Sequence, residues 1–444
     1  MPDNTHSMIV LKFGGTSIGS PDRMKNVANL ICQTKNPFVV LSAMAGTTNT
    51  LLEIAGYLHN RNSVGAIETL KQLESKYYSV VAQLYDTDEA KDEAGKYVKE
   101  VFAYLSTFTK QLFTTVQEKI IVAQGELLSS YLMTLFLREK GKNVALLPAL
   151  DYMRINLQGE PDTEAIREHL LMRLDENKGA DIFLTQGFIC RNAQEEIDNL
   201  QRGGSDYTAS LVGAAIDAEE IQIWTDIDGM HNNDPREISG TQSVRHLQFE
   251  EAAELAYFGA KILHPTCIQP AKFANIPVRL LNTMDPDAPG TLIDNKPERG
   301  VIKAIAAKDN IVAIKIKSSR MLLAYGFLRR VFEIFEGYRT SIDMICTSEV
   351  GVSMTIDDTT HLNEIIHDLK RYGTVSVDLD MCIICVVGDM DWYNLGFETK
   401  ALDAMKEIPV RMISYGGSNY NISFLVQEED KKKALQALNR HLFE

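Results

Sequence analysis

Short apolar runs alternate with stretches of helical periodicity along residues 1–290. Most of these runs are continuous rather than alternating, as in strands that are covered on both faces. The six strongest are Ile9–Phe13, Phe38–Leu41, Val144–Leu147, Ile182–Gln186, Ile221–Trp224 and Val278–Leu281. Between them, segments such as Leu70–Leu84 carry apolar residues at three-to-four spacing, which indicates helices. The pattern predicts an α/β fold: a three-layer α/β/α domain around a mainly parallel sheet. Ligands of such sheets bind at the carboxyl ends of the strands.

The remainder of the chain nearly repeats itself after a proline-rich linker at Asp285–Gly300. The first copy predicts strand Ile311–Ile316, helix Gly326–Phe335, a hairpin of Ser341–Thr347 and Val350–Ile356, and helix His361–Leu369. The second copy predicts the matching elements Cys382–Val387, Lys400–Lys406, Val410–Ser414, Ile422–Val426 and Asp430–Asn439. The second copy has little room for a fourth strand, and the strand Val301–Ala306 is expected to complete its sheet by insertion of one repeat within the other. Compact units of this kind are ferredoxin-like.

The domain boundaries follow from this pattern. We expect one large domain over 1–295 and a second region over 300–444. Within that region, the first small domain covers about 311–380. The second covers 381–444 together with strand 301–306.

Composition narrows the class of partner. The chain has 444 residues, of which 45% are apolar and 24% charged, and its net charge is −15. An acidic surface repels polyphosphate, so nucleic acid and anionic membranes are not expected partners. The N-terminal residues lack the pattern of a signal peptide, and the apolar runs are strand-sized, so we expect a cytoplasmic protein.

Cysteine and histidine spacing predicts no metal site. The six cysteines are scattered, and only Cys382 and Cys385 are close in sequence. Residues i and i+3 of a strand face opposite sides, which is poor geometry for joint ligation. We expect buried, reduced thiols, and the nine histidines form no spaced ligand set either.

Two glycine- or hydroxyl-rich turns follow the first two strands. Lys12 ends the first strand ahead of Gly14 and Gly15, where backbone N–H groups can approach an anion and the lysine adds positive charge. The spacing is not that of a P-loop, and an ordinary tight turn is the alternative. Ser42 and Thr48 lie in the turn after the second strand, where they suit a carboxylate or phosphate or simply cap a helix.

Charged residues at later turns add further candidates. Glu126 lies among apolar neighbours in a predicted helix over 120–135, so it is either a paired functional group or a misread surface residue. The turn Arg202–Tyr207 opens a helix, and it combines an arginine suited to a carboxylate with an N-terminus that attracts negative charge. Capping by Ser205 or Asp206 is the structural alternative, and both readings can hold together.

Two more strand-end segments complete the inventory. Thr225 and Asp226 end a strand and can contact a nucleotide or orient magnesium, although turn formation alone also explains the following Asp-Gly and Asp-Pro pairs. Lys261 by itself is a solvated charge. Together these segments supply cations for phosphates and acceptors for an ammonium. That set suits phosphoryl transfer between a nucleotide and an amino acid.

Four segments, in order and spacing, resemble the signature stretches of the aspartate kinases, members of the amino acid kinase family. They are Lys12–Ser17, Arg202–Tyr207, Trp224–Arg236 and Phe258–Pro265. The C-terminal region resembles the paired ACT domains with which these enzymes sense an end-product amino acid. The chain departs from the usual pattern at Gln201 and at His231, Asn232 and Asn233, where glycine, tyrosine and small hydroxyl residues are frequent.

The resemblance implies transfer of the ATP γ-phosphoryl group to L-aspartate, with Mg²⁺ on the phosphates, as the first step of lysine, threonine and methionine biosynthesis. Lys12 and Lys261 are the expected catalytic residues. The expected substrate residues are Ser42, Thr48, Glu126, Arg202, Gly203, Gly204, Ser205 and Asp206. Of these, Arg202 holds the α-carboxylate of aspartate, and Glu126 and Asp206 receive its ammonium. The expected ATP residues are Lys12, Gly14, Gly15, Thr225, Asp226, His231, Arg236, Lys261 and Ile262.

The resemblance also implies feedback inhibition by L-lysine and a homodimer formed through the ACT domains. The expected effector residues are Met321, Ala324, Phe327, Leu328, Ser341, Ile342, Asp343, Ser348 and Glu349. Asp343 and Glu349 offer negative charge to ammonium groups, unless Asp343 only caps a turn and Glu349 is a solvated hairpin residue. Ala324 stands where a lysine-sensitive relative has serine. The rival functions are a kinase for another substrate and a non-catalytic amino-acid sensor.

Overall fold

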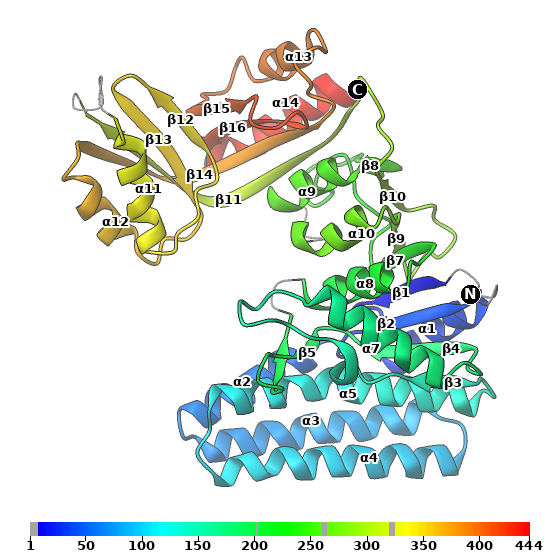
Figure 1. Cartoon of the computed structure of the whole chain (residues 1–444). Coiled ribbons are helices and arrows are strands. Elements are labelled where there is room, and N and C mark those ends of the chain that lie inside the picture. The colour runs from blue at the N-terminus through cyan, green and yellow to red at the C-terminus, as the bar shows by residue number, and fades with distance from the viewer. Residues whose placement is uncertain (1–7, 201–202, 260–263, 319–324) are drawn as a thin grey trace. The chain divides into compact units, whose positions relative to one another are not determined.

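The computed structural model describes residues 8–200, 203–259, 264–318 and 325–444 (Figure 1). The chain forms two compact units. One comprises Met1–Met230 with Leu263–Asn295, and the other His231–Ile262 with Lys296–Glu444. Residues 231–262, which we expected in the N-terminal domain, group with the second unit, and the boundaries 1–295 and 300–444 stay a prediction.

The first unit is built on a mainly parallel sheet. All six apolar runs form strands, and every residue of β2 and β4 is buried, which explains their continuous hydrophobicity. The strands run in the order β3-β4-β2-β1-β7-β9-β10, and only β10 is antiparallel to its neighbour β9. They are β1 (Ile9–Phe13), β2 (Pro37–Leu41), β3 (Val144–Leu146), β4 (Ile182–Gln186), β7 (Glu220–Thr225), β9 (Val278–Asn282) and β10 (Thr291–Asp294).

Helices cover this sheet, as expected for an α/β/α domain. In Figure 1, α3, α4 and α5 run alongside one another as a layer of long helices. One core cluster joins buried residues of β1 and β2 to α1 and to these helices. The helices are α1 (Pro21–Gln33), α2 (Thr47–His59), α3 (Ser63–Leu84), α4 (Asp88–Thr107), α5 (Thr115–Glu139), α6 (Ala149–Tyr152), α7 (Thr163–Glu176), α8 (Gly204–Ala215) and α10 (Gln269–Phe273). A small hairpin, β5 (Ile189–Arg191) and β6 (Ile197–Asn199), follows β4.

Helix α5 is longer and more apolar than the sequence analysis allowed. Among the described residues it is the one helix long and apolar enough to cross a membrane, but 83% of that apolar window is buried inside the protein. A capping box of Thr114 and Gln117 begins the helix. Its apolar faces pack in the core, and the segment around Glu126 is therefore buried.

The second unit contains an antiparallel sheet that carries both repeats. Its order is β12-β13-β11-β14-β16-β15. The strands are β11 (Ile302–Lys317), β12 (Ile345–Ser348), β13 (Gly351–Ile356), β14 (Thr374–Gly388), β15 (Met412–Tyr415) and β16 (Asn421–Gln427). The segments Val301–Ala306 and Ile311–Ile316, which we expected as separate strands, are parts of the single strand β11. The first part pairs with the end of β14 and the second with its beginning.

Both long strands bend where one repeat passes into the other. Asn310 in β11 and Asp380 in β14 have positive φ values of 59° and 53°, and the pairing shifts register between Lys308 and Ile311. Helices α11 (Phe327–Gly337) and α12 (Leu362–Leu369) pack on the first repeat, and α13 (Phe397–Ala404) and α14 (Lys431–Phe443) on the second. The unit also contains β8 (His246–Gln248) and α9 (Phe249–Tyr257).

The repeats begin their first helices in the same way. Gly326 precedes α11 and Gly396 precedes α13, each as a left-handed N-cap, with φ values of 78° and 90°. The predicted fold class is confirmed: an α/β/α domain with a mainly parallel sheet, followed by two ferredoxin-like units.

Candidate active site

A pocket of about 480 Å³ opens at the carboxyl ends of the strands of the first unit. Six of the predicted residues line it: Gly15, Ser42, Thr48, Glu126, Gly204 and Ser205. They come from the turn after β1, the turn after β2, the middle of α5 and the start of α8. Parallel strands bring these distant turns to one edge of the sheet, as the sequence pattern predicts.

Lys12 and Asp206 form an ion pair beside this pocket. Lys12 Nζ lies 2.7 Å from Asp206 Oδ1, and the two side chains are 12% and 15% exposed. Their contact is electrostatic, because Oδ1 of Asp206 receives no well-aligned hydrogen bond among the described residues. The lysine therefore keeps donors that can turn toward an incoming anion.

Glu126 is buried and only partly satisfied. It is 3% exposed, and its Oε1 accepts a hydrogen bond of 3.2 Å from the backbone N–H of Ala43. Its Oε2 has no hydrogen-bond partner among the described residues. Burial raises the pKa of Glu126 to about 7, although the N–H of Ala43 works in the opposite direction. A buried carboxylate without a cation is a suitable receptor for an ammonium group.

Glycine is required where the turns approach one another. A Cβ atom on Gly15 would lie 2.8 Å from the carbonyl oxygen of Ala43. Gly203, with φ +77°, precedes α8, and a Cβ there would meet the sulfur of Cys267. Gly204 lies against the ring of Phe188, which itself has a positive φ of 66°. The backbone of the site is thus closely packed before any ligand is bound.

Hydroxyl groups connect the turns. Ser42 Oγ donates a 2.7 Å hydrogen bond to Ser205 Oγ, which links the turn after β2 to the start of α8. Ser129, on α5, donates to the carbonyl oxygen of Ser42 at 2.7 Å. The sequence analysis did not single out Ser129, and it also did not single out seven pocket residues: Thr16, Ala43, Met44, Ala45, Gly46, Asn49 and Phe188. Thr16 and Asn49 adjoin predicted motif residues, whereas nothing in the local sequence marks Phe188.

The candidate nucleotide residues of the first unit lie at the ends of two strands: Lys12, Gly14 and Gly15 at the end of β1, and Thr225 and Asp226 at the end of β7. Thr225 donates to Asp226 Oδ1 at 3.1 Å, and Thr283 donates to the carbonyl oxygen of Thr225 at 2.9 Å. Ser17, from the first glycine turn, donates to the carbonyl oxygen of Trp224. These contacts hold the ends of neighbouring strands together. Asp226 is exposed.

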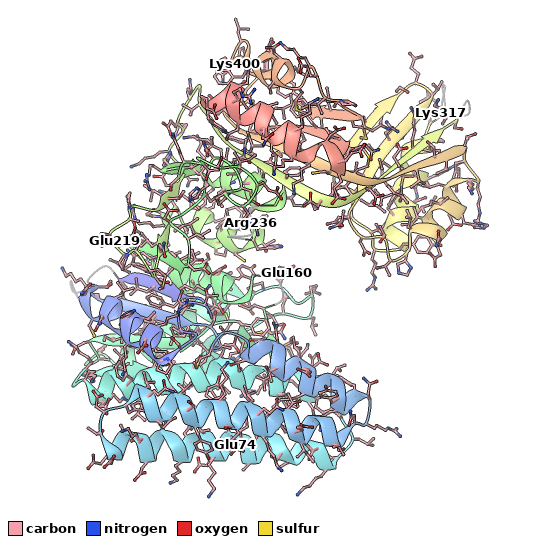
Figure 2. The ribbon with its side chains drawn as sticks, turned by 180° about the vertical axis from the view of Figure 1, so that it is seen from behind. Glu74, Glu160, Glu219, Arg236, Lys317 and Lys400 are labelled. Atoms are coloured by element: carbon pink, nitrogen blue, oxygen red, sulfur yellow. The ribbon has the colours of Figure 1, made fainter. Side chains whose placement is uncertain are left out.

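The other nucleotide candidates belong to the second unit or lie outside the described residues. His231 Nδ1 is 3.0 Å from Thr241 Oγ1, and Arg236, labelled in Figure 2, forms a bidentate pair with Asp234. Lys261, Ile262 and Arg202 lie outside the described residues.

Asn232 and Asn233, which depart from the family pattern, form hydrogen bonds within the second unit. Asn232 is buried, exchanges hydrogen bonds with the backbone of Gln242, and accepts one from the N–H of Ile305 on β11. Asn233 is also buried and donates to Asn439 on α14. Within the second unit, the backbone carbonyl of Asn232 connects the 231–239 loop to the repeat sheet, and the side chain of Asn233 connects it to the last helix.

The candidate effector residues form two groups. Phe327 is buried in the core of the first repeat and Ile342 packs against it, whereas Leu328, Ser341, Ser348 and Glu349 are exposed. Met321 and Ala324 lie outside the described residues. Asp343 does more than cap a turn, because it accepts hydrogen bonds from Lys308 and Tyr257.

No cluster of three or more histidine, cysteine, aspartate or glutamate side chains able to hold a metal ion occurs among the described residues. The carboxylates near the pocket and strand ends, Asp206 and Asp226, stand singly. They suit Mg²⁺ only if phosphate oxygens supply its other ligands, which is the usual arrangement for this ion.

Sequence comparison identifies the family to which the chain is similar. Residues 7–282 match the amino acid kinase family model, and residues 384–442 match an ACT domain model. Lysine-sensitive aspartokinase 3 of Escherichia coli is 32% identical over 98% of this chain and 99% of its own length. Aspartokinase 2 of Arabidopsis thaliana, a chloroplastic protein, is 33% identical over 98% of this chain and 84% of its own.

Solved structures agree in fold. Crystal structures of E. coli aspartokinase III match 98% of this chain and 100% of their own. The complex with aspartate and ADP (R-state) has a TM-score of 0.83 at 32% identity, and the complex with lysine and aspartate (T-state) has 0.78 at 33%. Aspartate kinase of Clostridium acetobutylicum shares the fold, with a TM-score of 0.85 at 24% identity. By its sequence, its pocket and its two regulatory repeats, the chain belongs to the aspartokinases of the amino acid kinase family.

Proposed function

We propose that this aspartokinase transfers the γ-phosphoryl group of ATP to the β-carboxylate of L-aspartate, using the pocket of the first unit, and that L-lysine inhibits it. One observation carries the substrate assignment. The buried Glu126, whose Oε2 has no hydrogen-bond partner in the described segments, and the Lys12–Asp206 pair offer an ammonium receptor and a cation at the edge of the same sheet. The E. coli relative has been crystallised with aspartate and ADP.

Aspartate presents two carboxylates and one ammonium to the pocket. Glu126 Oε2 and Asp206 receive the ammonium, while Arg202 grips the α-carboxylate with its guanidinium. The hydroxyl groups of Ser42, Thr48 and Ser205 complete the lining. This arrangement leaves the β-carboxylate of aspartate directed toward Lys12.

Transfer needs no covalent intermediate with the protein. An oxygen of the β-carboxylate attacks the γ-phosphorus, and the bond from that phosphorus to the bridging oxygen of ADP breaks, giving an acyl phosphate and ADP. Lys12 stabilises the charge shared between the two reactants, and Lys261 acts from the nucleotide side. Mg²⁺, carried on the phosphates, would neutralise their remaining negative charge.

ATP is held by the glycine turn after β1 and by residues that follow β7. Gly14 and Gly15 allow backbone N–H groups to reach the phosphates. Thr225, Asp226, His231, Arg236 and Ile262 make the remaining contacts by resemblance to the family. Before Arg236 can hold a phosphate it has to leave its bidentate pair with Asp234.

Feedback inhibition is assigned to the first repeat. The exposed residues at the start of α11 and in the β12–β13 hairpin form the effector site, and Asp343 and Glu349 supply its negative charge. The lysine complex of the E. coli relative supports this choice of effector. We also propose a cytoplasmic homodimer formed through the ACT domains.

The decisive experiment is an ADP-release assay with ATP, Mg²⁺ and L-aspartate, combined with hydroxylamine trapping of the acyl phosphate. L-Glutamate is the control substrate. We expect ADP and hydroxamate in equal amounts with aspartate alone, and inhibition by L-lysine but not by L-threonine. ADP release that does not depend on aspartate would contradict the substrate assignment. Absence of turnover would favour the rival function, a non-catalytic amino-acid sensor.

A further inference from the structure

Lys308, on β11, divides its charge between two carboxylates. Its Nζ lies 2.7 Å from Asp343 Oδ1 and 2.9 Å from Asp357 Oδ2, and 4.5 Å from the centre of the Tyr257 ring. Burial would lower the pKa of Lys308, but the two carboxylates more than compensate, so its pKa is raised. The lysine is therefore charged and fully engaged.

Among the described residues, the cluster is one cation short. Two carboxylates share one ammonium, which leaves a net charge of about −1 in a partly buried position. The side chain of Asp343 is 1% exposed, and its Oδ2 has no hydrogen-bond partner in the part of the chain that the structure describes. An oxygen that is buried, charged and unpaired is costly unless a ligand meets it.

Asp343 also touches the helix that leads toward Lys261. Tyr257, the last residue of α9, donates a 2.6 Å hydrogen bond to Asp343 Oδ1. Two residues later, Gly259 has φ +122°, and a Cβ there would lie 2.1 Å from the carbonyl oxygen of Ala307, the neighbour of Lys308. The end of α9 thus lies directly against β11 at the acidic cluster.

We propose that Lys308, Asp343, Asp357 and Tyr257 form the coupling point between the effector site and the kinase segment, where an ammonium of the effector supplies the missing cation. This inference rests on the proposed effector site. When the ammonium binds Asp343, Lys308 passes to Asp357, and each carboxylate gains its own cation. No charge is left unpaired by the exchange, so it costs little.

The exchange changes what Tyr257 can bind. Its hydroxyl and Lys308 both bond to Asp343 Oδ1. Movement of Lys308 or Asp343 therefore changes the hydrogen bond that fixes the end of α9. Lys261 follows Tyr257 by four positions in the sequence. Effector binding is thereby transmitted to a residue that serves ATP. An effector shifts this equilibrium only by its differential affinity for the two arrangements.

The test uses two variants with opposite expected signs. Asp357→Asn balances the charge of the cluster, because Lys308 then pairs with Asp343 alone, and L-lysine should bind about 2- to 5-fold more weakly. Lys308→Met leaves two carboxylates without a cation, and L-lysine should bind more tightly by a similar factor. Asp358→Asn is the matched control, since Asp358 is exposed, adjoins Asp357 and lies outside the cluster.

Binding of L-lysine to the full-length proteins is measured by isothermal titration calorimetry. Wild-type affinity in Asp357→Asn, or shifts of both variants in one direction, would overturn the proposal. Asp357 is 43% exposed, so its variant remains informative even if Lys308→Met fails to fold. If wild type phosphorylates aspartate but binds no lysine, the inference fails and the kinase assignment stands. If L-lysine binds most tightly to Lys308→Met and most weakly to Asp357→Asn, but wild type does not phosphorylate aspartate, the inference is supported and the kinase assignment is contradicted.

Coupling is tested separately with Tyr257→Phe, which keeps the ring and removes the hydroxyl. Saturating L-lysine should still bind. The change that it causes in the KM for ATP should fall by about fivefold or more, the lower range of measured couplings. An unchanged KM response to lysine would exclude Tyr257 from the coupling.

Discussion

Each unit of the molecule contains a lysine–aspartate pair with the same separation, 2.7 Å, and the two pairs do different work. Lys12 and Asp206 lie beside the pocket of the first unit, and Asp206 has no well-aligned hydrogen bond from its partner. Lys308 and Asp343 are enclosed in the second unit by a further carboxylate and a tyrosine. The distance between the two charges therefore does not distinguish the roles of the pairs, whereas the number of further partners that each pair has does distinguish them.

The two pairs differ in how readily the lysine can leave its carboxylate partners. No further acidic partner of Lys12 is found in the described part of the first unit, so an arriving phosphate or carboxylate can recruit its ammonium. Lys308 already pairs with two carboxylates. An arriving cation, and not an anion, would therefore neutralise the remaining negative charge at this position. The first pair is suited to catalysis and the second to sensing.

Breaking the first pair should have the largest effect. Lys12→Met removes the charge that stabilises the transition state, and we expect kcat to fall by about 100- to 1,000-fold while ADP binding changes little. Steady-state assays and ADP titration measure the two quantities. Lys25→Met, on α1, is the control, because that lysine donates a hydrogen bond to the carbonyl oxygen of Gln83 and does not line the pocket. A kcat near that of wild type would remove Lys12 from catalysis.

Glu126 extends the comparison, because it is a buried carboxylate with no lysine partner among the described residues. Glu126→Gln keeps the shape and removes the charge, so the KM for aspartate should rise by about 10- to 150-fold. Because the pKa of Glu126 is raised to about 7, the wild-type KM should also increase as the pH falls below that value. Glu118→Gln, on the same helix but partly exposed, is the control. A pH profile that is the same in wild type and Glu126→Gln would contradict the assignment.

The same pKa has a consequence for stability. The pKa of about 7 in the folded state lies above the ordinary glutamate value of 4.5, so the folded state holds the proton more tightly and loses stability as the pH rises between these values. The charged carboxylate then costs on the order of 3 kcal/mol above pH 7. Glu126→Gln should therefore resist urea better than wild type at pH 8, and the difference should vanish near pH 4.

The smallest effect is expected from the hydroxyl contact between the two turns. Ser42→Ala removes the 2.7 Å hydrogen bond to Ser205 but leaves both charges of the Lys12–Asp206 pair in place. A neutral hydrogen bond contributes about 0.5–1.5 kcal/mol, so kcat/KM for aspartate should fall by about 2- to 13-fold. A loss as large as that of Lys12→Met would mean that Ser42 has a catalytic role of its own.

Much of the fold was predictable because its strands are buried on both faces. Continuous apolar runs such as those of β2 and β4 cannot lie at a surface, and polar residues that follow them must meet at one sheet edge. This reasoning located the turns around Lys12 and Ser42, whereas Glu126 was found as a carboxylate among apolar neighbours in a helix. It missed Phe188, whose left-handed backbone has no sequence signature in a bulky residue.

The coupling cluster could not be predicted from the sequence. Tyr257 and Asp343 are 86 positions apart, and Lys308 reaches both from a strand whose register shifts at that point. The grouping of residues 231–262 with the second unit has the same origin. It depends on long-range packing by side chains such as Asn232 and Asn233, which looked like departures from a nucleotide-binding pattern.

The strands shared by the two repeats also bear on how the regulatory region can be cut. β11 and β14 each run through both halves of the sheet, but the first repeat is continuous in sequence, whereas the second repeat takes the beginning of β11 and the end of β14 from either side of it. A truncation after Asp380 would therefore keep all strands of the first repeat and leave the second repeat with only the beginning of β11. Because the two repeats share these continuous strands, the intact region should denature in a single cooperative transition.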